Sequence, residues 1–254
     1  MSIRVGLMGF GRTGSIVASE IIKEPAMTLS WVCRKNISSD FQFASHALGK
    51  DSNFAPFITA DNISEQFLKH NPVDVIIDFS NHQSVKLYET FSKFNIAIVS
   101  AISNYSTEEL KIISNESNHS PILHSPNITL GINWLMLASK LLRKIIPHAD
   151  IEIVEEHFRD KKDASGTALR IAEQLQLNPK KHVNSIRVGG IVGKHEIIFG
   201  LPYQTIRLTH ESINRAAFGT GAIFAAKWLI GKTPGLYSME EVLQKKFIAQ
   251  IENM

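Results

Sequence analysis

The sequence predicts an α/β protein, with a parallel β-sheet covered by helices in the first part of the chain and a second domain of the α+β class. In the first half, short apolar runs alternate with amphipathic helical patterns, which is typical of a parallel sheet with helices on both faces. In the second half, strand-like runs follow one another with glycines between them, which favours a mainly antiparallel sheet. At 254 residues, with 44% hydrophobic residues, the chain is long enough for both domains.

The N-terminal elements predict a nucleotide site. The apolar run from Ile3 to Met8 leads into the turn GFGRTG and then into a helical pattern, which is the order that a Rossmann-type dinucleotide-binding unit requires. The first glycine permits the tight turn, the second lets the backbone approach a pyrophosphate, and the third lets helix and strand pack closely. A glycine-rich turn without a ligand is the alternative interpretation. The predicted cofactor contacts in this turn are Gly9, Gly11 and Gly14.

The second strand, TLSWVCRKN, bears on which dinucleotide binds. A cofactor without a phosphate on its adenosine ribose usually meets an acidic residue about 20 residues after the glycines, whereas Arg accommodates the phosphorylated form. This strand ends in Arg34 and Lys35, with no acid. The sequence therefore favours NADPH, with NADH as the alternative cofactor. A solvated basic strand end would have the same sequence.

The third and fourth strands end in small polar turns. The run VDVIIDF is followed by Ser80, and the run NIAIV by the turn Ser100–Ser103. Ligands of a parallel sheet bind at the carboxyl ends of its strands, so both turns should border the nicotinamide.

The stretch EEHFRDKKDASGTAL, Glu155 to Leu169, has a chemical composition that suits an anionic substrate. A strand-like run ends near His157, a charged loop follows, and the SGT turn at 165–167 opens a helical pattern. Free N–H groups and hydroxyls at a helix N-terminus can hold a carboxylate. His157, Arg159 or Lys161 can supply charge and a proton. A capped helix after a solvated loop would give the same pattern without a substrate.

The composition argues against several classes of protein. The formal charge of +3 is too small to indicate nucleic-acid binding, and no apolar run approaches the ~20 residues that cross a membrane. The ten histidines never pair four residues apart within one predicted helix, and the single Cys33 forms no cluster, so no metal site is expected. One cysteine, and a first strand without a signal-peptide pattern, indicate the cytoplasm.

Several segments, in order along nearly the whole chain, resemble one family, the 4-hydroxy-tetrahydrodipicolinate reductases (dihydrodipicolinate reductases) of bacterial lysine and diaminopimelate biosynthesis. They are GFGRTG, DVIIDFS, SPNITLGIN, EEHFRDKKDASGTAL, RVGGIVGKHEIIFG and LTHESINRAAFGTGA. The fourth and fifth together are much more specific than a glycine turn. The resemblance implies an NAD(P)H-dependent oxidoreductase that converts 4-hydroxy-tetrahydrodipicolinate, a small dicarboxylate, to tetrahydrodipicolinate. It also implies a homotetramer.

The resemblance implies a domain organisation as well. We expect a Rossmann domain at 1–127, an α+β substrate-binding and tetramerisation domain at 128–216, and a C-terminal segment at 217–254 that returns to the first domain. Arg34 and Lys35 fall where the family discriminates between NADH and NADPH. Further cofactor contacts are expected at Arg12, Thr13, Phe79, Ser80, Ser100, Ser103, Ser125 and Asn127.

The catalytic residues are also implied by the resemblance. His157 falls at the catalytic histidine and Lys161 at the proposed proton-donating lysine. The turn that binds a substrate carboxylate falls at Ser165, Gly166 and Thr167.

Three departures from the family pattern bear on activity. Phe158 stands where the family commonly has a second histidine. The block before Thr167 is one residue shorter, which leaves the register of Lys161 against Lys162 open. Ser100–Ser103 replaces a Gly-Thr-Thr-Gly turn, and its side chains hinder the backbone approach that glycine permits. Two alternatives follow: a reductase of a different cyclic imine or unsaturated acid, and a catalytically weak nucleotide-binding paralogue.

Overall fold

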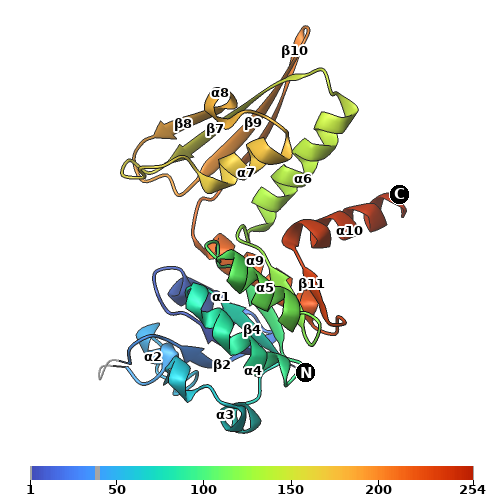
Figure 1. Cartoon of the computed structure of the whole chain (residues 1–254). Coiled ribbons are helices and arrows are strands. Elements are labelled where there is room, and N and C mark those ends of the chain that lie inside the picture. The colour runs from blue at the N-terminus through green and yellow to red at the C-terminus, as the bar shows by residue number, and fades with distance from the viewer. Residues whose placement is uncertain (1, 38–40, 254) are drawn as a thin grey trace. The chain divides into compact units, whose positions relative to one another are not determined.

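The computed structural model describes residues 2–37 and 41–253. It divides into two compact units, and Figure 1 draws the elements of each. Unit 1 consists of Met1–Ile128 and Phe218–Val242, and unit 2 of Thr129–Ala217 and Leu243–Met254. Of the segment 217–254, which we expect to return to the first domain, Phe218–Val242 belong to unit 1 and Leu243–Met254 to unit 2.

Within the described residues, unit 1 is built on a seven-stranded sheet whose neighbouring strands are all parallel. In sheet order the strands are β11 (Gly235–Tyr237), β6 (Pro121–His124), β5 (Ala97–Ser100), β4 (Val75–Asp78), β1 (Ile3–Met8), β2 (Met27–Cys33) and β3 (Phe57–Ile58). The chain runs outward from β1 to β3 and then returns to place β4 on the other side of β1. Ligands of such sheets bind at the carboxyl ends of the strands where the order reverses, here between β1 and β4.

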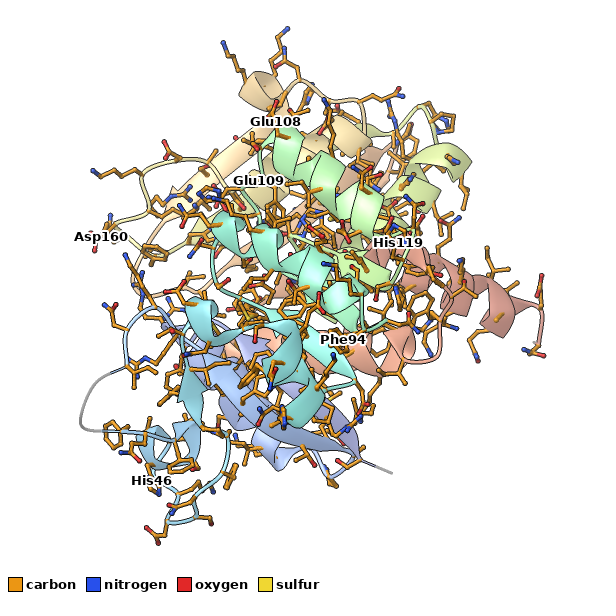
Figure 2. All side chains as sticks on the ribbon, turned by 60° about the horizontal axis from the view of Figure 1, so that its bottom comes forward. His46, Phe94, Glu108, Glu109, His119 and Asp160 are labelled. Atoms are coloured by element: carbon orange, nitrogen blue, oxygen red, sulfur yellow. The ribbon has the colours of Figure 1, made fainter. Side chains whose placement is uncertain are left out.

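Helices cover the sheet of unit 1 and bury its apolar strands. They are α1 (Gly14–Lys23), α2 (Ala44–Ala47), α3 (Glu65–His70), α4 (Tyr88–Ser92), α5 (Thr107–Glu116) and most of α9 (Ala216–Leu229), with the 3-10 turns η1 (Ala60–Asn62) and η2 (His82–Leu87). All four residues of β4 and of β5 are buried, as expected for strands covered on both faces. Ser106 and Glu109 form a capping box that starts α5. Figure 2 shows Glu108 and Glu109 at that end of the helix.

Unit 2 contains, within residues 41–253, a four-stranded sheet with the order β10-β9-β7-β8. Its strands are β7 (Asp150–His157), β8 (Val183–Arg187), β9 (Lys194–Leu201) and β10 (Gln204–Glu211). The pairs β7–β9 and β9–β10 are antiparallel, but β7 and β8 are parallel. The sheet is therefore mixed. The helices α7 (Gly166–Gln174) and α8 (Pro179–His182) form the crossover connection that the parallel strands β7 and β8 need.

One face of β7 faces the core of unit 2, with α6 (Leu130–Ile145) and α7 packed in the same core. Ile151 and Ile153 point inward at every second position, and the same period brings Glu155 to the buried side. A carboxylate is thus buried next to the end of the strand. The last helix, α10 (Met239–Ile251), contacts Trp134 of α6 through Phe247.

Candidate active site

The glycine turn after β1 has the geometry that a pyrophosphate requires. Gly9 has a φ of 97°, a left-handed value that favours glycine, and a Cβ there would lie 2.7 Å from the carbonyl oxygen of Phe79. A Cβ at Gly14 would collide with the carbonyl oxygen of Gly9. Gly11 and Arg12 are exposed, so the N–H groups at the start of α1 can receive an anion.

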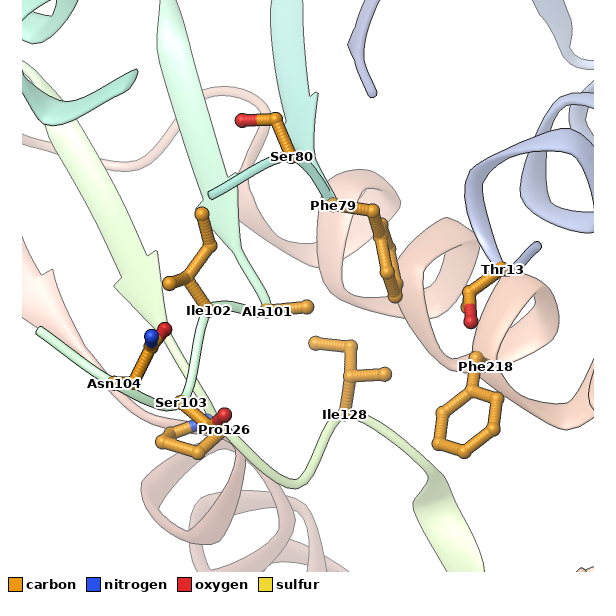
Figure 3. Close-up of a pocket in the computed structure, with 10 residues that line it drawn as sticks. All are labelled: Thr13, Phe79, Ser80, Ala101, Ile102, Ser103, Asn104, Pro126, Ile128 and Phe218. Atoms are coloured by element: carbon orange, nitrogen blue, oxygen red, sulfur yellow. The ribbon is translucent and has the colours of Figure 1, made fainter. Parts of the chain in front are cut away.

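A pocket of about 260 Å³ opens at the carboxyl ends of the strands in unit 1 (Figure 3). The turns that follow β1, β4, β5 and β6 contribute to it, together with α9. Its lining residues are Thr13, Phe79, Ser80, Ala101, Ile102, Ser103, Asn104, Pro126, Ile128 and Phe218. Four predicted cofactor residues therefore meet in one pocket: Thr13, Phe79, Ser80 and Ser103.

Three other predicted cofactor residues, Ser100, Ser125 and Asn127, do not line this pocket. Ser100 is fully buried, with its hydroxyl 2.9 Å from that of Tyr105. The hydroxyl of Ser125 donates to the carbonyl of Asn127 over 2.8 Å. Ser100 and Ser125 therefore support the turns that form the pocket wall.

A buried chain of hydroxyl groups joins the ends of β4 and β5. The fully buried Asp78 accepts hydrogen bonds from Ser80 and from the hydroxyl of Tyr88. The Tyr88 hydroxyl lies 3.0 Å from that of Tyr105, which contacts Ser100. Burial raises the pKa of Asp78, while the hydrogen bonds oppose this rise. The chain ties together the two turns that border the pocket.

Backbone groups of the turn Ser100–Ser103 form further hydrogen bonds. The N–H of Ala101 donates to the carbonyl of Asp78 over 3.0 Å, and Nε2 of His124 lies 2.9 Å from the carbonyl oxygen of Ile102. Ile102 itself is buried. The turn therefore accommodates the side chains of Ala101 and Ile102, and these hydrogen bonds hold its conformation.

Arg34, at the end of β2, lies beside the glycine turn. Its guanidinium is 4.7 Å from the ring centroid of Phe57 and 6.0 Å from that of Phe10, and the two rings pack edge to face. Stacking on aromatic rings orients the guanidinium before any ligand arrives. Lys35 is exposed.

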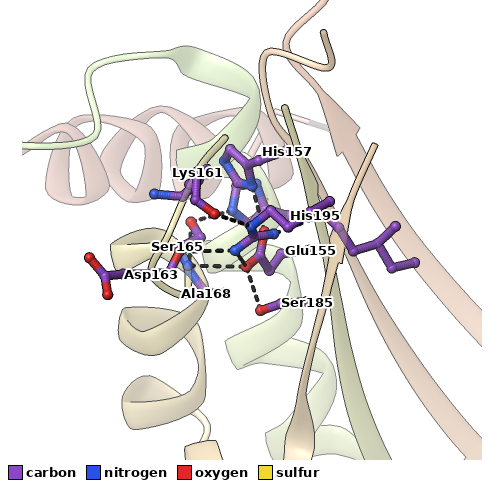
Figure 4. Close-up of polar contacts among 10 residues, drawn as sticks. Glu155, His157, Lys161, Asp163, Ser165, Ala168, Ser185 and His195 are labelled. Carbon is purple, nitrogen blue, oxygen red and sulfur yellow. Dashed lines mark hydrogen bonds and ion pairs between the residues drawn. The ribbon is translucent and has the colours of Figure 1, made fainter. Parts of the chain in front are cut away.

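A second cluster of functional groups lies in unit 2 at the end of β7 (Figure 4). Oε2 of Glu155 lies 2.5 Å from Nδ1 of His157. The side chain of Glu155 is fully buried and that of His157 is 11% exposed. The carboxylate is thus shielded from water while the imidazole keeps an accessible part.

Arg187 pairs with the same carboxylate. Its Nη1 and Nη2 lie 2.8 Å and 2.6 Å from the two oxygens of Glu155, and Ser185 donates to Oε1 over 2.6 Å. Burial by itself would raise the pKa of Glu155, but the hydrogen bonds from Arg187, Ser185 and His157 outweigh it and lower the pKa to about 2.

The predicted carboxylate-binding turn begins α7. The hydroxyl of Ser165 accepts from the N–H of Ala168 and lies 2.9 Å from Nε2 of His195. Ser165 is buried, whereas Gly166 is exposed and Thr167 is half-buried. The N–H of Ser165 donates to Glu155.

His195, on β9, packs edge to face against His157 with the ring centroids 5.3 Å apart. It is 6% exposed, and its Nδ1 has no hydrogen-bond partner within the described part of the chain. Burial and the nearby His157 lower the pKa of His195 to about 4. A neutral, partly unsatisfied imidazole therefore lies behind the turn at 165–167.

The lysine loop, residues 158–164, differs from the strand before it in being largely exposed. Lys161 is half-buried, whereas Lys162 is exposed. Neither ammonium group forms an ion pair with another described residue. Phe158 is 39% exposed.

Sequence reasoning missed several polar residues of this cluster. They are Glu155, Ser185, Arg187 and His195. The one local signal was the alternation of β7, which places Glu155 with Ile151 and Ile153 on the buried face. Among residues 2–37 and 41–253 no group of three or more His, Cys, Asp or Glu side chains is arranged to hold a metal ion. No helix there is long and apolar enough to span a membrane.

The parallel sheet and its glycine turn define a Rossmann-type dinucleotide-binding protein. The chain belongs to the dihydrodipicolinate reductase family: the family's N-terminal model matches residues 3–128 and its C-terminal model residues 131–243.

Individual relatives agree with this family. The 4-hydroxy-tetrahydrodipicolinate reductase of Caldanaerobacter subterraneus subsp. tengcongensis is 41% identical over 194 residues, which cover 68% of this chain and 77% of the relative. That of Buchnera aphidicola subsp. Cinara cedri is 34% identical over 261 aligned positions, covering 92% and 94%.

Solved structures show the same fold. Dipicolinate-bound dihydrodipicolinate reductase from Paenisporosarcina sp. TG-14 has a TM-score of 0.79 at 21% identity and covers 95% of this chain and 100% of its own. The C. glutamicum DAP dehydrogenase in complex with DAP has a TM-score of 0.56 at 10% identity, covering 94% and 93%.

Proposed function

We propose that the protein is an NAD(P)H-dependent oxidoreductase that converts 4-hydroxy-tetrahydrodipicolinate to tetrahydrodipicolinate in lysine and diaminopimelate biosynthesis. Family membership supports the reaction. The observation that carries it is the cluster in unit 2, where a carboxylate-paired imidazole and the N-terminus of α7 occur with the half-buried Lys161. These groups can bind a small dicarboxylate and supply a proton.

The residues divide the chemistry as follows. The nicotinamide cofactor, when bound, supplies a hydride. The backbone of the glycine turn holds its pyrophosphate, and Thr13, Phe79, Ser80 and Ser103 line the adjacent pocket. In this proposal, residues of unit 2 bind the substrate and donate the proton.

In unit 2, Gly166 and Thr167 present N–H groups and a hydroxyl to one substrate carboxylate. Lys161 lies beside the bound anion and donates the proton as the hydride arrives. His157 orients or polarises the same region. The positive charge of Lys161 and the N-terminus of α7 favour substrates that carry an anionic group.

NADPH is the preferred form of the cofactor in this proposal. Arg34 is oriented by Phe57 and Phe10, and Lys35 follows it at the end of β2. Two cations at this position favour the ribose phosphate. The proposal also includes a homotetramer, as the resemblance to the family implies, and the cytoplasm as its location, as the single cysteine favours.

One experiment tests the function. Oxidation of NADPH is followed on substrate generated by coupling to dihydrodipicolinate synthase, and binding of NADPH is measured in parallel. We expect both turnover and binding. Binding without turnover would replace the proposal with a nucleotide-binding paralogue, and turnover of only another cyclic imine would change the substrate.

A further inference from the structure

Three parts of the cluster in unit 2 meet at one ion pair, that of Glu155 and Arg187. Glu155 accepts from the imidazole of His157 and from the N–H of Ser165. Arg187 donates through Nε to the carbonyl of Lys161 over 3.0 Å, and through Nη2 to the carbonyl of Asp163 over 2.9 Å. The imidazole, the helix N-terminus and the lysine loop thus share one pair of side chains.

We propose that Glu155 and Arg187 are the positioning residues of this site: Glu155 sets the tautomer and orientation of His157, and Arg187 sets the backbone that carries Lys161. The inference rests on the proposed function, because the roles are assigned relative to that reaction. We assign neither residue a contact with the substrate, because the side chain of Glu155 is fully buried and the guanidinium of Arg187 is bonded to Glu155 and to two carbonyls of the loop.

The first half of the proposal follows from hydrogen-bond chemistry. An ionised carboxylate only accepts, so Nδ1 of His157 carries the hydrogen of that bond. In the neutral ring Nε2 then has a free lone pair. Within residues 2–37 and 41–253 no hydrogen bond to Nε2 is formed. Glu155 therefore leaves Nε2 available to a ligand and prevents the ring from rotating.

The second half follows from the lysine loop. Residues 158–164 lie outside regular secondary structure and are mostly exposed, so few packing contacts hold them. Arg187 bonds two carbonyls of this loop while its charge is paired with Glu155. A guanidinium can do both because its five N–H groups point along fixed directions. A lysine at position 187 could keep the charge but not both carbonyl contacts.

A buried ion pair is weak evidence for stability, because desolvation offsets much of the attraction. Here the hydrogen-bond partners of Glu155 and Arg187 indicate a role in positioning the site. Glu155 and Arg187 form hydrogen bonds with the imidazole of His157, with the start of α7 and with the lysine loop. Their other hydrogen-bond partners are Ser185 and the carbonyl of Ile186.

The tautomer can be observed directly. In protein labelled with 15N-histidine, long-range 1H–15N correlations at a pH where the ring is neutral should show the hydrogen of His157 on Nδ1, with the signal assigned from His157→Gln. Glu155→Gln replaces the acceptor at Oε2 by an amide that can donate, so the hydrogen should move to Nε2. Glu156→Gln, one residue along on the opposite face and paired with Lys194, should leave His157 unchanged.

A hydrogen on Nε2 in the wild-type protein would overturn the proposal, and that outcome does not depend on whether Glu155→Gln folds. The same tautomer in wild-type protein and folded Glu155→Gln would also overturn it. This arm is independent of turnover, so an absence of reductase activity would defeat the proposed function without deciding the role of Glu155.

Kinetics supply the second arm. Glu155→Gln should lower kcat on the order of 10²-fold while the Kd for NADPH stays unchanged. The loss should be largely absent when His157→Gln is already present, because Glu155 acts through that ring. Arg187→Lys should lower kcat with the tautomer of His157 unchanged. Equal losses from Glu155→Gln in both backgrounds would show that Glu155 does not act through His157.

Discussion

Gly193 lies so close to His157 that a Cβ in place of its hydrogen would be 3.0 Å from Nε2 of the ring. Glu155 holds the opposite side of the same ring, so the imidazole has little freedom to move away. Gly193→Ala should therefore displace the ring and lower kcat, by tenfold or more and on the order of 10²-fold at most. Gly190→Ala is the matched control, because a Cβ there would meet nothing within 4 Å. Wild-type kcat in Gly193→Ala would show that the ring position does not matter.

The two adjacent lysines should separate in kinetics. Lys161→Ala should lower kcat by a general-acid factor on the order of 10²–10⁴, whereas Lys162→Ala should have little effect because this side chain is exposed. Thr167→Val should chiefly raise KM if the hydroxyl contributes uniform binding. A severe effect of Lys162→Ala together with a mild one of Lys161→Ala would mean that the deletion in the loop has been placed one residue off.

Cofactor preference should depend on Arg34. Arg34→Ala should weaken NADPH binding by about 1.5–3 kcal/mol, the range of a charge-assisted hydrogen bond, and should change NADH binding far less. Calorimetric titration of both cofactors measures the difference. Lys23→Ala, a surface change in α1, serves as the control. Equal dissociation constants of the wild-type protein for NADPH and NADH would contradict the expected preference.

The stability of unit 2 should fall in mild acid because of His195. Its pKa is about 4 in the folded protein against an ordinary value of 6.5, so between these values the unfolded chain binds more protons than the folded one. Stability therefore decreases as the pH falls from about 6.5 to 4, by on the order of 3 kcal/mol. Urea denaturation at pH 7 and pH 5 should show a smaller decrease for His195→Gln than for the wild-type protein. His119→Gln, at an exposed position, should behave as wild type.

The exposed edges of the unit 2 sheet should mediate assembly of the tetramer. Ile186, Val188 and Tyr203 are exposed apolar or aromatic residues on or beside the edge strands β8 and β10, and uncovered edges favour association. Light scattering should give a mass about four times the 28.3 kDa of one chain. Ile186→Glu should reduce this mass, whereas Leu110→Glu on α5 should not. A stable monomer at micromolar concentration would contradict the tetramer.

Local patterns in the sequence could predict the elements of the fold and part of the site. The glycine turn and the strand before it are contiguous, and so are His157 and the turn at 165–167. Arg187 could not be found in this way, because it reaches Glu155 across 32 residues through the parallel pairing of β7 and β8. Ser100 ends a strand and is predicted to contact the cofactor, and its buried hydroxyl lies 2.9 Å from that of Tyr105, a partner that the local pattern does not reveal.

The hydroxyl chain beneath the pocket in unit 1 has a polarity. Four hydrogen bonds converge on Asp78, from the N–H and hydroxyl of Ser80 and the hydroxyls of Ser84 and Tyr88. The hydroxyl of Tyr88 donates to Asp78, so it accepts from Tyr105, which in turn accepts from Ser100. Every hydrogen in the chain is therefore directed from β5 toward β4. Loss of the Tyr105 hydroxyl would leave the hydroxyl of Ser100 without its acceptor and the hydroxyl of Tyr88 without its donor. The ends of β4 and β5 would then no longer be joined by one continuous series of hydrogen bonds.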